Sequence, residues 1–474
     1  MPGVIKNIIV LMLENRSFDR MLGFLKEHNP EIEGLTGTES NPTDPQLASQ
    51  GNVEMVTVSR FTGEEGYITD PDPHHEFPDV TFQLFGEESE PSPAIPKNNG
   101  FVASYSLVHD RTGVPIGVEK GKTIMKCFDP LTQLPVLSAL AQNFLLCDHW
   151  FCSVPGPTWP NRFFVHAASS NGHVDSPSAL EALKDEIAFS TYGMRTIYEN
   201  LTEKNLSWKI YYHDFPHALA LANLHRFPDS FRPFNEFEED ARMGDLPHYT
   251  FIEPAYFNLP LSAASDQHPP HDVRAGERLL ADIYNTIRGN ETLWNQSLFV
   301  VLYDEHGGSY DHVPPPKAIN PDGKVSVSPP FSFDRLGVRV PAILVSPYVG
   351  KGQVDHTIYD HTSLIATVKK LFDLPQFLTK RDAAANTFEH RILDAPRADT
   401  PATLVPADSA PKQVEQSDVM QSMEGFSEFQ RSLVKLSTLI NTAASPRTKL
   451  EGVNLAKDQL AKFFGIKGTD SSRK

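Results

Sequence analysis

The sequence has little cysteine and no long apolar run. Three cysteines occur among 474 residues, Cys127, Cys147 and Cys152, in an odd number and at irregular spacing. This excludes a disulfide framework and predicts buried, inert thiols. No stretch approaches the roughly 20 apolar residues that a membrane-spanning helix needs. We therefore expect a globular chain without transmembrane segments.

The N-terminus lacks the features of a secretory leader. The apolar run over residues 8–13 is short, no small-residue cleavage site follows it, and Glu14-Asn15-Arg16 comes next. A first buried β-strand explains this pattern better than a signal peptide. We therefore expect a cytoplasmic protein.

Excess positive charge is absent as well. Lys and Arg number 42 against 60 Asp and Glu, which gives a formal net charge of -18. The sequence shows none of the basic stripes of a nucleic-acid binder, and its charge repels anionic membranes at long range. A phosphate-bearing substrate would therefore need a local positive centre, such as a metal ion or a few placed Arg and His side chains.

Apolar runs alternate with amphipathic stretches. Strands are predicted at residues 4–13, 144–151, 208–212, 297–303 and 341–348, and helices at 131–142, 275–288 and 362–372. A helix is also predicted to begin near residue 161, and Ser17 is expected to cap a short helix after the first strand. Such alternation is typical of an α/β layered fold, in which ligands gather at the carboxyl ends of the strands.

Two regions depart from this alternation. Residues 29–120 are rich in Pro, Gly and acidic residues and lack a sustained period, so we expect a long irregular but ordered loop over a site. Residues 396–413 form a Pro/Ala-rich linker, followed by predicted helices at 419–440 and 453–464. The predicted division is a catalytic domain over 1–395 and a smaller helical extension over 396–474. The apolar stripes of the extension fit a packed face or a membrane anchor.

Acidic side chains follow two of the predicted strands. Asp304-Glu305-His306-Gly307-Gly308 ends the strand at 297–303, and Glu14-Asn15 ends the first strand. Carboxylates at neighbouring strand ends are ready ligands for a hard or borderline cation. The alternatives are a polar turn at Asp304 and a helix cap at Asn15.

A hydroxyl and several histidines complete the candidate chemistry. Thr158 lies between prolines ahead of a predicted helix, where the helix N-terminus and Arg162 could hold a phosphoryl group; a plain helix cap is the alternative. Histidines in polar loops suit acid–base work or metal ligation, although a single loop histidine is as often solvated. They are His75, His268, His271, His312 and His361.

These motifs resemble a known family. The runs ENRSFD from Glu14, TWPNR from Thr158, HPPHD from His268 and YDEHGGSYDHVPPP from Tyr303 look like the phosphoesterase family of non-specific phospholipases C, closest to the plant type, and related acid phosphatases. The resemblance runs from the N-terminus to about Glu389. It implies an alkaline-phosphatase-like fold, with a central mixed sheet flanked by helices.

The resemblance also implies roles for individual residues. A divalent metal ion of unspecified identity would be held by Glu14, Asn15, Asp304 and Glu305. Thr158 matches the nucleophile, His75 a loop histidine of the site, and either His268 or His271 the general acid. Asn161, Arg162 and His361 are predicted to bind substrate. Two positions depart from the pattern: His74 stands where a small residue is expected, so it could exchange roles with His75, and Trp159 replaces a smaller polar residue.

The resemblance predicts a phospholipase C. The expected reaction converts glycerophospholipids to diacylglycerol and a phosphorylated head group through a phosphothreonine. The alternatives are an acid phosphatase acting on soluble monoesters and a non-catalytic lipid-binding protein, which the complete set of site residues disfavours. The predicted partner is a phospholipid substrate met through peripheral membrane contact, without nucleic acid.

Overall fold

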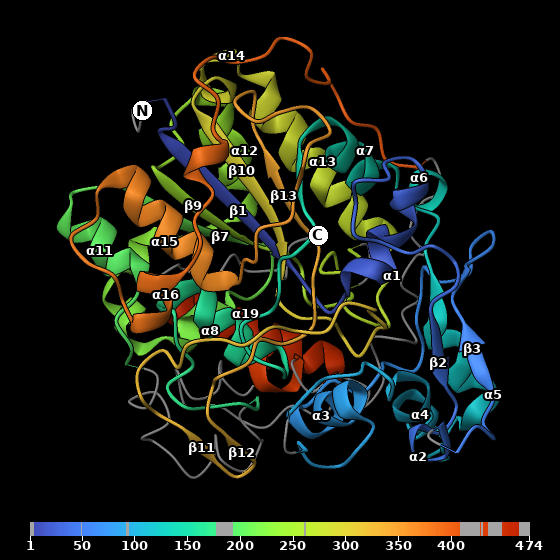
Figure 1. Cartoon of the computed structure of the whole chain (residues 1–474). Helices are drawn as coiled ribbons and strands as arrows, with labels where there is room; N and C mark the ends of the chain where they lie inside the picture. Colours follow the sequence, from blue (N-terminus) through green and yellow to red (C-terminus); the bar gives the residue numbers. More distant parts are fainter. Residues whose placement is uncertain are drawn as a thin grey trace.

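A central eight-stranded sheet organises the molecule (Figure 1). The computed structural model describes residues 4–48, 50–91, 94–176, 193–259, 262–407, 427, 430–434 and 448–463. The strand order is β14-β6-β13-β10-β1-β9-β7-β8. The strands are β1 (Asn7–Leu13), β6 (Leu145–Cys147), β7 (Trp208–Tyr212), β8 (Phe231–Pro233), β9 (Tyr249–Glu253), β10 (Ser297–Tyr303), β13 (Ala342–Val345) and β14 (Val354–Asp355).

The sheet is mixed. β1 pairs in parallel with both β10 and β9, while β13 runs antiparallel to its neighbours β10 and β6. Two successive reversals make β6 run in the same direction as β1 and β10. The side chains of β10 and of Ile8–Leu13 in β1 are buried, as continuous apolar runs in the middle of a covered sheet should be. The predicted α/β class with a mixed central sheet is confirmed.

Helices flank the sheet (Figure 1). In that view α7 (Pro135–Asn143) and α13 (Val273–Gly289) lie to the right of the sheet, and α11 (Ile197–Glu203) and α15 (His361–Phe372) to the left. α13 carries the predicted apolar stripe, since Leu279, Ile283 and Ile287 are all buried. Further helices are α1 (Phe18–Leu22), α6 (Pro130–Gln133), α8 (Thr158–Ala167), α12 (Phe234–Met243), α14 (Glu291–Trp294) and α16 (Lys380–Ala384).

Several element boundaries follow the predictions and others correct them. β7 and β10 have the predicted bounds, and Ser17 caps α1 by accepting from the Arg20 amide. The predicted helix at 131–142 is split into α6 and α7, because Pro135 keeps Leu134 out of the helical region, at φ −127° and ψ 59°. The strand predicted over 144–151 ends at Cys147, and β9 was not predicted.

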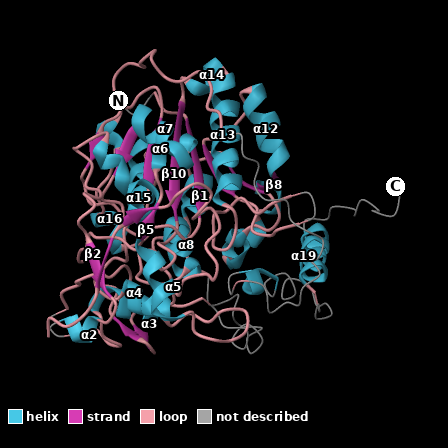
Figure 2. Cartoon of the chain, turned by 90° about the vertical axis from the view of Figure 1, so that its right-hand side faces the viewer, coloured by secondary structure: helices cyan, strands magenta, loops and turns pink. Residues whose placement is uncertain are grey.

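The region 29–120 is more regular than predicted. Its helices are α2 (Pro45–Ala48), α3 (Phe77–Phe85), α4 (Phe101–Ser106) and α5 (Gly117–Gly121), and its strands are β2 (Ser40–Pro42), β3 (Met55–Thr57) and β4 (Ser59–Arg60), which pairs with β5 (Lys126–Cys127). Buried Val80, Leu84 and Phe101 belong to a second hydrophobic cluster here. The prediction of one irregular stretch is therefore wrong. Figure 2 shows α3, α4 and α5 together at the lower end of the molecule.

The described part of the C-terminal extension packs against the main core. Leu404, Leu433 and Val453 all belong to the same buried cluster as the central sheet. The helix predicted at 453–464 is α19 (Lys449–Phe463), while residue 464 and most of the helix predicted at 419–440 lie outside the described residues. The domain boundary at residue 395 stays a prediction. Among the described residues, no helix combines the length and the apolarity needed to cross a bilayer.

Short elements complete the described chain. A two-stranded hairpin is formed by β11 (Ser326–Val327) and β12 (Pro330–Phe331). The short 3-10 helices are Gly23–Glu27, Lys122–Met125, His217–Ala220, Ala222–Arg226, Pro228–Ser230 and Glu389–Arg391.

Candidate active site

Two acidic dipeptides meet where β1 and β10 end. Because Leu13 is paired with Tyr303 in parallel register, the residues that follow each strand become neighbours. The Asn15 amide donates to Oδ1 of Asp304 at 3.1 Å. Glu14, Asn15, Asp304 and Glu305 are all fully buried. The structure therefore brings the four predicted metal-site residues together in one cluster.

The backbone at this cluster is tightly constrained. Asn15 adopts a positive φ of 55°, and Gly307, at φ 61°, lies directly against it. A Cβ added to Gly307 would lie 2.3 Å from the carbonyl oxygen of Asn15. The glycine thus serves both the left-handed turn and the close approach of two loops.

Arg162 lies among the buried carboxylates. Its guanidinium approaches Glu14 at 2.9 Å and both Asp304 and Glu253 at 3.5 Å. Burial raises the pKa of Glu14 well above its usual range, although Arg162 opposes this. Burial also raises the pKa of Asp304 to about 7, against Arg162 and with the help of Glu305. Glu253 was not singled out from the sequence, although it ends β9, the strand beside β1.

Three oxygens of the cluster have no hydrogen-bond partner. They are Glu14 Oε2, Asp304 Oδ2 and Glu305 Oε1, all buried. Unpartnered buried carboxylate oxygens are costly unless a cation offsets their charge. Arg162 alone does not satisfy them, so this donor set fits a divalent metal ion bound by oxygen ligands.

Thr158 is the first residue of α8 and faces the cluster. Its hydroxyl donates to Oδ1 of Asn15 at 3.4 Å. The residue before it, Pro157, occupies the cap position, and the helix has no side-chain cap, so the hydroxyl of Thr158 is not a helix cap. Asn161 holds the preceding loop: it accepts from the Val154 amide at 2.9 Å and donates to the carbonyl oxygens of Val154, Gly156 and Pro157.

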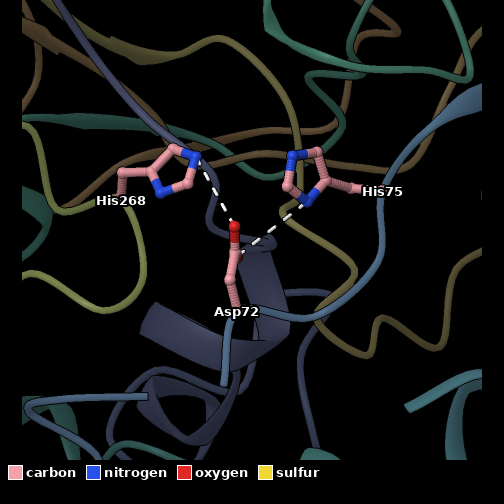
Figure 3. Close-up of side chains that lie close together, drawn as sticks. All are labelled: Asp72, His75 and His268. Carbon is pink, nitrogen blue, oxygen red and sulfur yellow. Dashed lines mark ion pairs between the residues drawn. The ribbon is translucent and has the colours of Figure 1, made fainter. Parts of the chain in front are cut away.

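A pocket of about 140 Å³ opens beside Thr158. Asp72, His75 and His268 line it and lie close together (Figure 3). Asp72 Oδ2 is 3.8 Å from Nε2 of His268, and Asp72 Oδ1 is 4.0 Å from Nδ1 of His75. Burial raises the pKa of Asp72 to about 7, opposed by His75. Asp72 was missed in the sequence, although it stands two residues before the His74-His75 pair.

The two adjacent loop histidines have different surroundings. His75 Nε2 lies 3.2 Å from the side-chain nitrogen of Asn15 and 4.0 Å from Glu305, while its Nδ1 donates to the Pro73 carbonyl at 2.7 Å. Burial lowers the pKa of His75, but Glu305 and Asp72 outweigh it and raise the value to about 10. His74 is paired instead with Asp79 at 3.7 Å. The geometry therefore places His75, rather than His74, against the carboxylate cluster.

His268 and His271 also differ in their surroundings. His268 lines the pocket, and its Nδ1 contacts the Pro269 carbonyl oxygen, which leaves Nε2 directed toward Asp72. Burial lowers the pKa of His268 well below its usual range, and His75 and His271 lower it further. His271 is held by Asp266 at 2.7 Å on Nδ1 and by Gln430, from the C-terminal extension, at 3.2 Å on Nε2.

Two other histidines predicted as site residues, His361 and His312, do not line the pocket. His361 Nε2 donates to the carbonyl oxygen of Asp304 at 2.7 Å, and its Nδ1 accepts from the Trp150 indole at 3.3 Å. Burial lowers the pKa of His361 to about 4, so the ring is neutral. His312 is paired with Asp19 at 2.6 Å and does not line the pocket.

Trp159, the residue after Thr158, is buried and contacts the C-terminal extension. Its indole donates to the hydroxyl of Ser432 at 2.8 Å. Together with Gln430, Ser432 places a described part of the C-terminal extension against the residues around Thr158. The larger side chain at this position therefore contacts the extension.

Fold and site together define a mixed α/β protein in which a polar pocket, lined by acidic and histidine side chains, lies beside a buried carboxylate cluster at the ends of β1 and β10. The chain belongs to the Phosphoesterase family, whose model matches residues 5–375. Two relatives from Arabidopsis thaliana are non-specific phospholipase C3, 42% identical over 84% of this chain and 76% of the relative, and non-specific phospholipase C1, 39% identical over 98% and 86%. A solved structure from Vibrio parahaemolyticus, described as a protein in the alkaline phosphatase superfamily, has a TM-score of 0.33 and 12% identity, covering 72% of this chain and 84% of that one.

Proposed function

We propose that this chain is a phospholipase C that hydrolyses glycerophospholipids to diacylglycerol and a phosphorylated head group. The observation that carries the proposal is the position of Thr158, which lines the pocket and also contacts Asn15 in the buried carboxylate cluster at the two strand ends. Family membership and the names of the relatives support the phosphodiester class of substrate.

Thr158 is the proposed nucleophile. Its position at the N-terminus of α8 directs backbone N–H groups toward a phosphoryl group at Oγ1. In the first step Oγ1 loses its proton to solvent and forms a bond to phosphorus, the bond to the diacylglycerol oxygen breaks, and Thr158 carries the phosphorylated head group as a phosphothreonine ester. Water then attacks the same phosphorus, the bond to Oγ1 breaks, the phosphorylated head group leaves, and the Thr158 hydroxyl takes a proton back from solvent.

His268 is the proposed proton carrier. It lines the pocket together with Thr158, whereas both ring nitrogens of His271 are engaged by Asp266 and Gln430. A bound phosphodiester adds negative charge beside His268 and so favours its protonated form. The imidazolium then gives its proton to the departing diacylglycerol oxygen, and the neutral ring takes one from the attacking water.

A divalent metal ion is the proposed cofactor. Glu14, Asn15, Asp304 and Glu305 would hold it, and when bound it supplies a positive charge that stabilises the developing charge on the phosphoryl oxygens. Arg162 is proposed to offset the charge of the buried carboxylates, since its guanidinium lies among Glu14, Glu253 and Asp304.

Two predicted substrate-binding residues are better suited to positioning. His361 holds the Asp304 carbonyl, and Asn161 holds the loop before Thr158. Both side chains are fully buried. We propose that they orient the groups that touch substrate.

The size of the pocket supports a substrate presented at a lipid surface. A volume of about 140 Å³ accepts a phosphorylated head but not two acyl chains. The acyl chains would therefore remain in the membrane while the head group enters, which accounts for the predicted peripheral membrane contact.

Parallel assays test the proposal. The full chain is supplied with phosphatidylcholine vesicles and, separately, with a soluble aryl phosphate. We expect release of diacylglycerol and phosphocholine at the higher rate, and a phosphocholine ester on Thr158 in acid-quenched samples analysed by mass spectrometry. Hydrolysis of the aryl phosphate alone would instead establish the acid phosphatase alternative.

A further inference from the structure

Two histidines converge on one carboxylate at the end of β6, away from the pocket. Asp148 and His149 directly follow β6, and His356 directly follows its parallel neighbour β14. Nδ1 of His149 lies 2.9 Å from Oδ1 of Asp148, and Nδ1 of His356 lies 3.0 Å from the same oxygen. The two rings meet edge to face, with centroids 5.9 Å apart.

The three donor atoms have the spacing of ligands around one small ion. They all lie within 4.8 Å of one another. Ligand atoms at tetrahedral positions around an ion, with bonds of about 2.0–2.1 Å, are roughly 3.3 Å apart. The two imidazole nitrogens and the carboxylate oxygen are therefore close to the required separation before any ion binds.

The carboxylate is held rigidly. Oδ2 of Asp148 accepts from the Glu33 amide at 2.7 Å, and its carbonyl oxygen accepts from Arg339 at 2.9 Å. Burial raises the pKa of Asp148, but hydrogen bonds from His149 and from the Glu33 amide lower it below its usual value, so the carboxylate is ionised. The side chain of Asp148 is fully buried, while that of His149 is 22% exposed and that of His356 54%. An ion bound here would keep its remaining positions open to solvent.

A comparison within the molecule separates this cluster from an ordinary ion-pair network. Asp19, Asp311 and His312 are grouped as closely, but Arg339 already pairs with both carboxylates, at 2.9 and 3.1 Å. Among the described residues, the carboxylate of Asp148 has ion pairs only with the two histidines.

The cluster is also separate from the proposed catalytic centre. β13 lies between β6 and β10 in the sheet. None of Asp148, His149 and His356 lines the pocket at Thr158.

We propose that Asp148, His149 and His356 form a second metal site, selective for divalent ions that accept imidazole ligands, of which Zn²⁺ is the test ion. Imidazole nitrogens suit zinc, copper and nickel, whereas an all-oxygen cluster such as that at Glu14 and Asp304 suits harder ions. An ion at this site joins the loop after β6 to the turn after β14. It therefore stabilises the position of the edge strand β14 beside β6.

The test counts bound zinc. Full-length chain is stripped with a chelator, dialysed and titrated with Zn²⁺, for the wild type and for His149→Asn, His356→Asn and the double variant. The matched control is His390→Asn, at an exposed histidine of the Glu389–Arg391 turn. We expect each site variant to bind one equivalent less than the wild type and to lose part of the zinc-induced rise in melting temperature, with phospholipase activity unchanged. The control should match the wild type in every measurement.

A second measurement uses unaltered protein. Diethyl pyrocarbonate modifies accessible imidazoles, and peptide mapping by mass spectrometry reports each histidine. Zn²⁺ should protect His149 and His356 at least several-fold and leave His390 reactive. Equal zinc stoichiometry in the wild type and the double variant, or equal modification of His149 and His356 with and without zinc, would overturn the proposal. Because neither readout depends on catalysis, the outcome is independent of the proposed phospholipase reaction.

Discussion

The hydroxyl of Thr158 lies 3.4 Å from Oδ1 of Asn15, across a sequence separation of 143 residues. Thr158→Ala removes the proposed nucleophile, so we expect the turnover of phosphatidylcholine to fall by about 10³-fold or more. Thr158→Ser keeps a hydroxyl at the same position and should retain most of the activity. Steady-state rates and circular dichroism spectra of both variants check this. Full activity in the alanine variant would exclude Thr158 as the nucleophile.

A substitution at Gly307 tests whether the position of Asn15 determines the catalytic activity. An alanine there would bring a Cβ to 2.3 Å from the Asn15 carbonyl oxygen, so Gly307→Ala should displace Asn15 and reduce activity by roughly 10²-fold through misplacement. Gly323→Ala is the matched control, because Gly323 also has a positive φ, of 82°, but nothing lies within 4 Å of its added Cβ. Both variants should lose about 1–2 kcal/mol of stability from the backbone conformation. Equal activities in the two variants would contradict the role given to the close approach.

Asparagine substitutions distinguish the two histidines of the 268–271 loop. His268→Asn and His268→Ala should both lower kcat by about 10²–10⁴-fold, since neither side chain transfers a proton. His271→Asn can still bond to Asp266, so it should recover activity relative to His271→Ala. Rates measured from pH 5 to 9 provide the check. The reverse pattern, with asparagine tolerated only at position 268, would transfer the proton role to His271.

The charge of the buried carboxylates should lower the stability of the metal-free protein. Asp304 has a pKa raised to about 7, and its Oδ2 has no hydrogen-bond partner, so Arg162 offsets its charge only in part when no metal ion is bound. Asp304→Asn should therefore equal or exceed the metal-free wild type in melting temperature, yet show no stabilisation by added divalent ions and negligible activity. Chelator-treated wild type should lose activity and recover it on metal addition. A chelator-insensitive wild type would rule out the metal.

The His312–Asp19 pair predicts a specific pH dependence of stability. Burial lowers the pKa of His312, but Asp19 and Asp311 outweigh it and raise the folded-state value to about 9. Because the folded pKa lies above the unfolded value of about 6.5, the contribution is complete below pH 6.5 and is lost as pH rises through 9. The difference in unfolding free energy between the wild type and His312→Gln should be larger at pH 6 than at pH 9.5, by roughly 3 kcal/mol. Urea unfolding at both values measures it, and a difference that does not change with pH would disprove the assignment.

The sequence predicted the middle of the sheet well and its surroundings less well. β1 and β10 are apolar runs buried on both faces, a pattern that needs no tertiary information. β9 escaped prediction because its five residues include Thr250 and Glu253, whose burial depends on their neighbours in the fold. The helix α3 was hidden in a region whose many prolines suggested a loop, yet Pro78 stands in the first turn of α3, where proline is tolerated.

The same distinction holds for the candidate site: residues at predicted strand ends could be placed from the sequence, and the others needed the folded structure. Glu14 and Asp304 could be placed together because both follow predicted strands. The roles of His268 and His271 could not be separated, because only the folded chain brings Gln430 to one of them and Thr158 to the pocket of the other. Glu253 and Asp72 needed the order of strands and the path of a long loop, neither of which is encoded in local periodicity.

The place of β1 in the sheet has a consequence for biosynthesis. β1 pairs with β9 and β10, whose residues begin at 249 and 297, so both partner strands are translated long after it. Its apolar run therefore stays unpaired with these strands while the intervening residues are translated, and transiently exposed apolar surface of this kind favours aggregation. The same separation means that a nascent chain ending before Asp304 lacks one of the two acidic dipeptides. A translation product truncated before that point could not assemble the proposed catalytic centre.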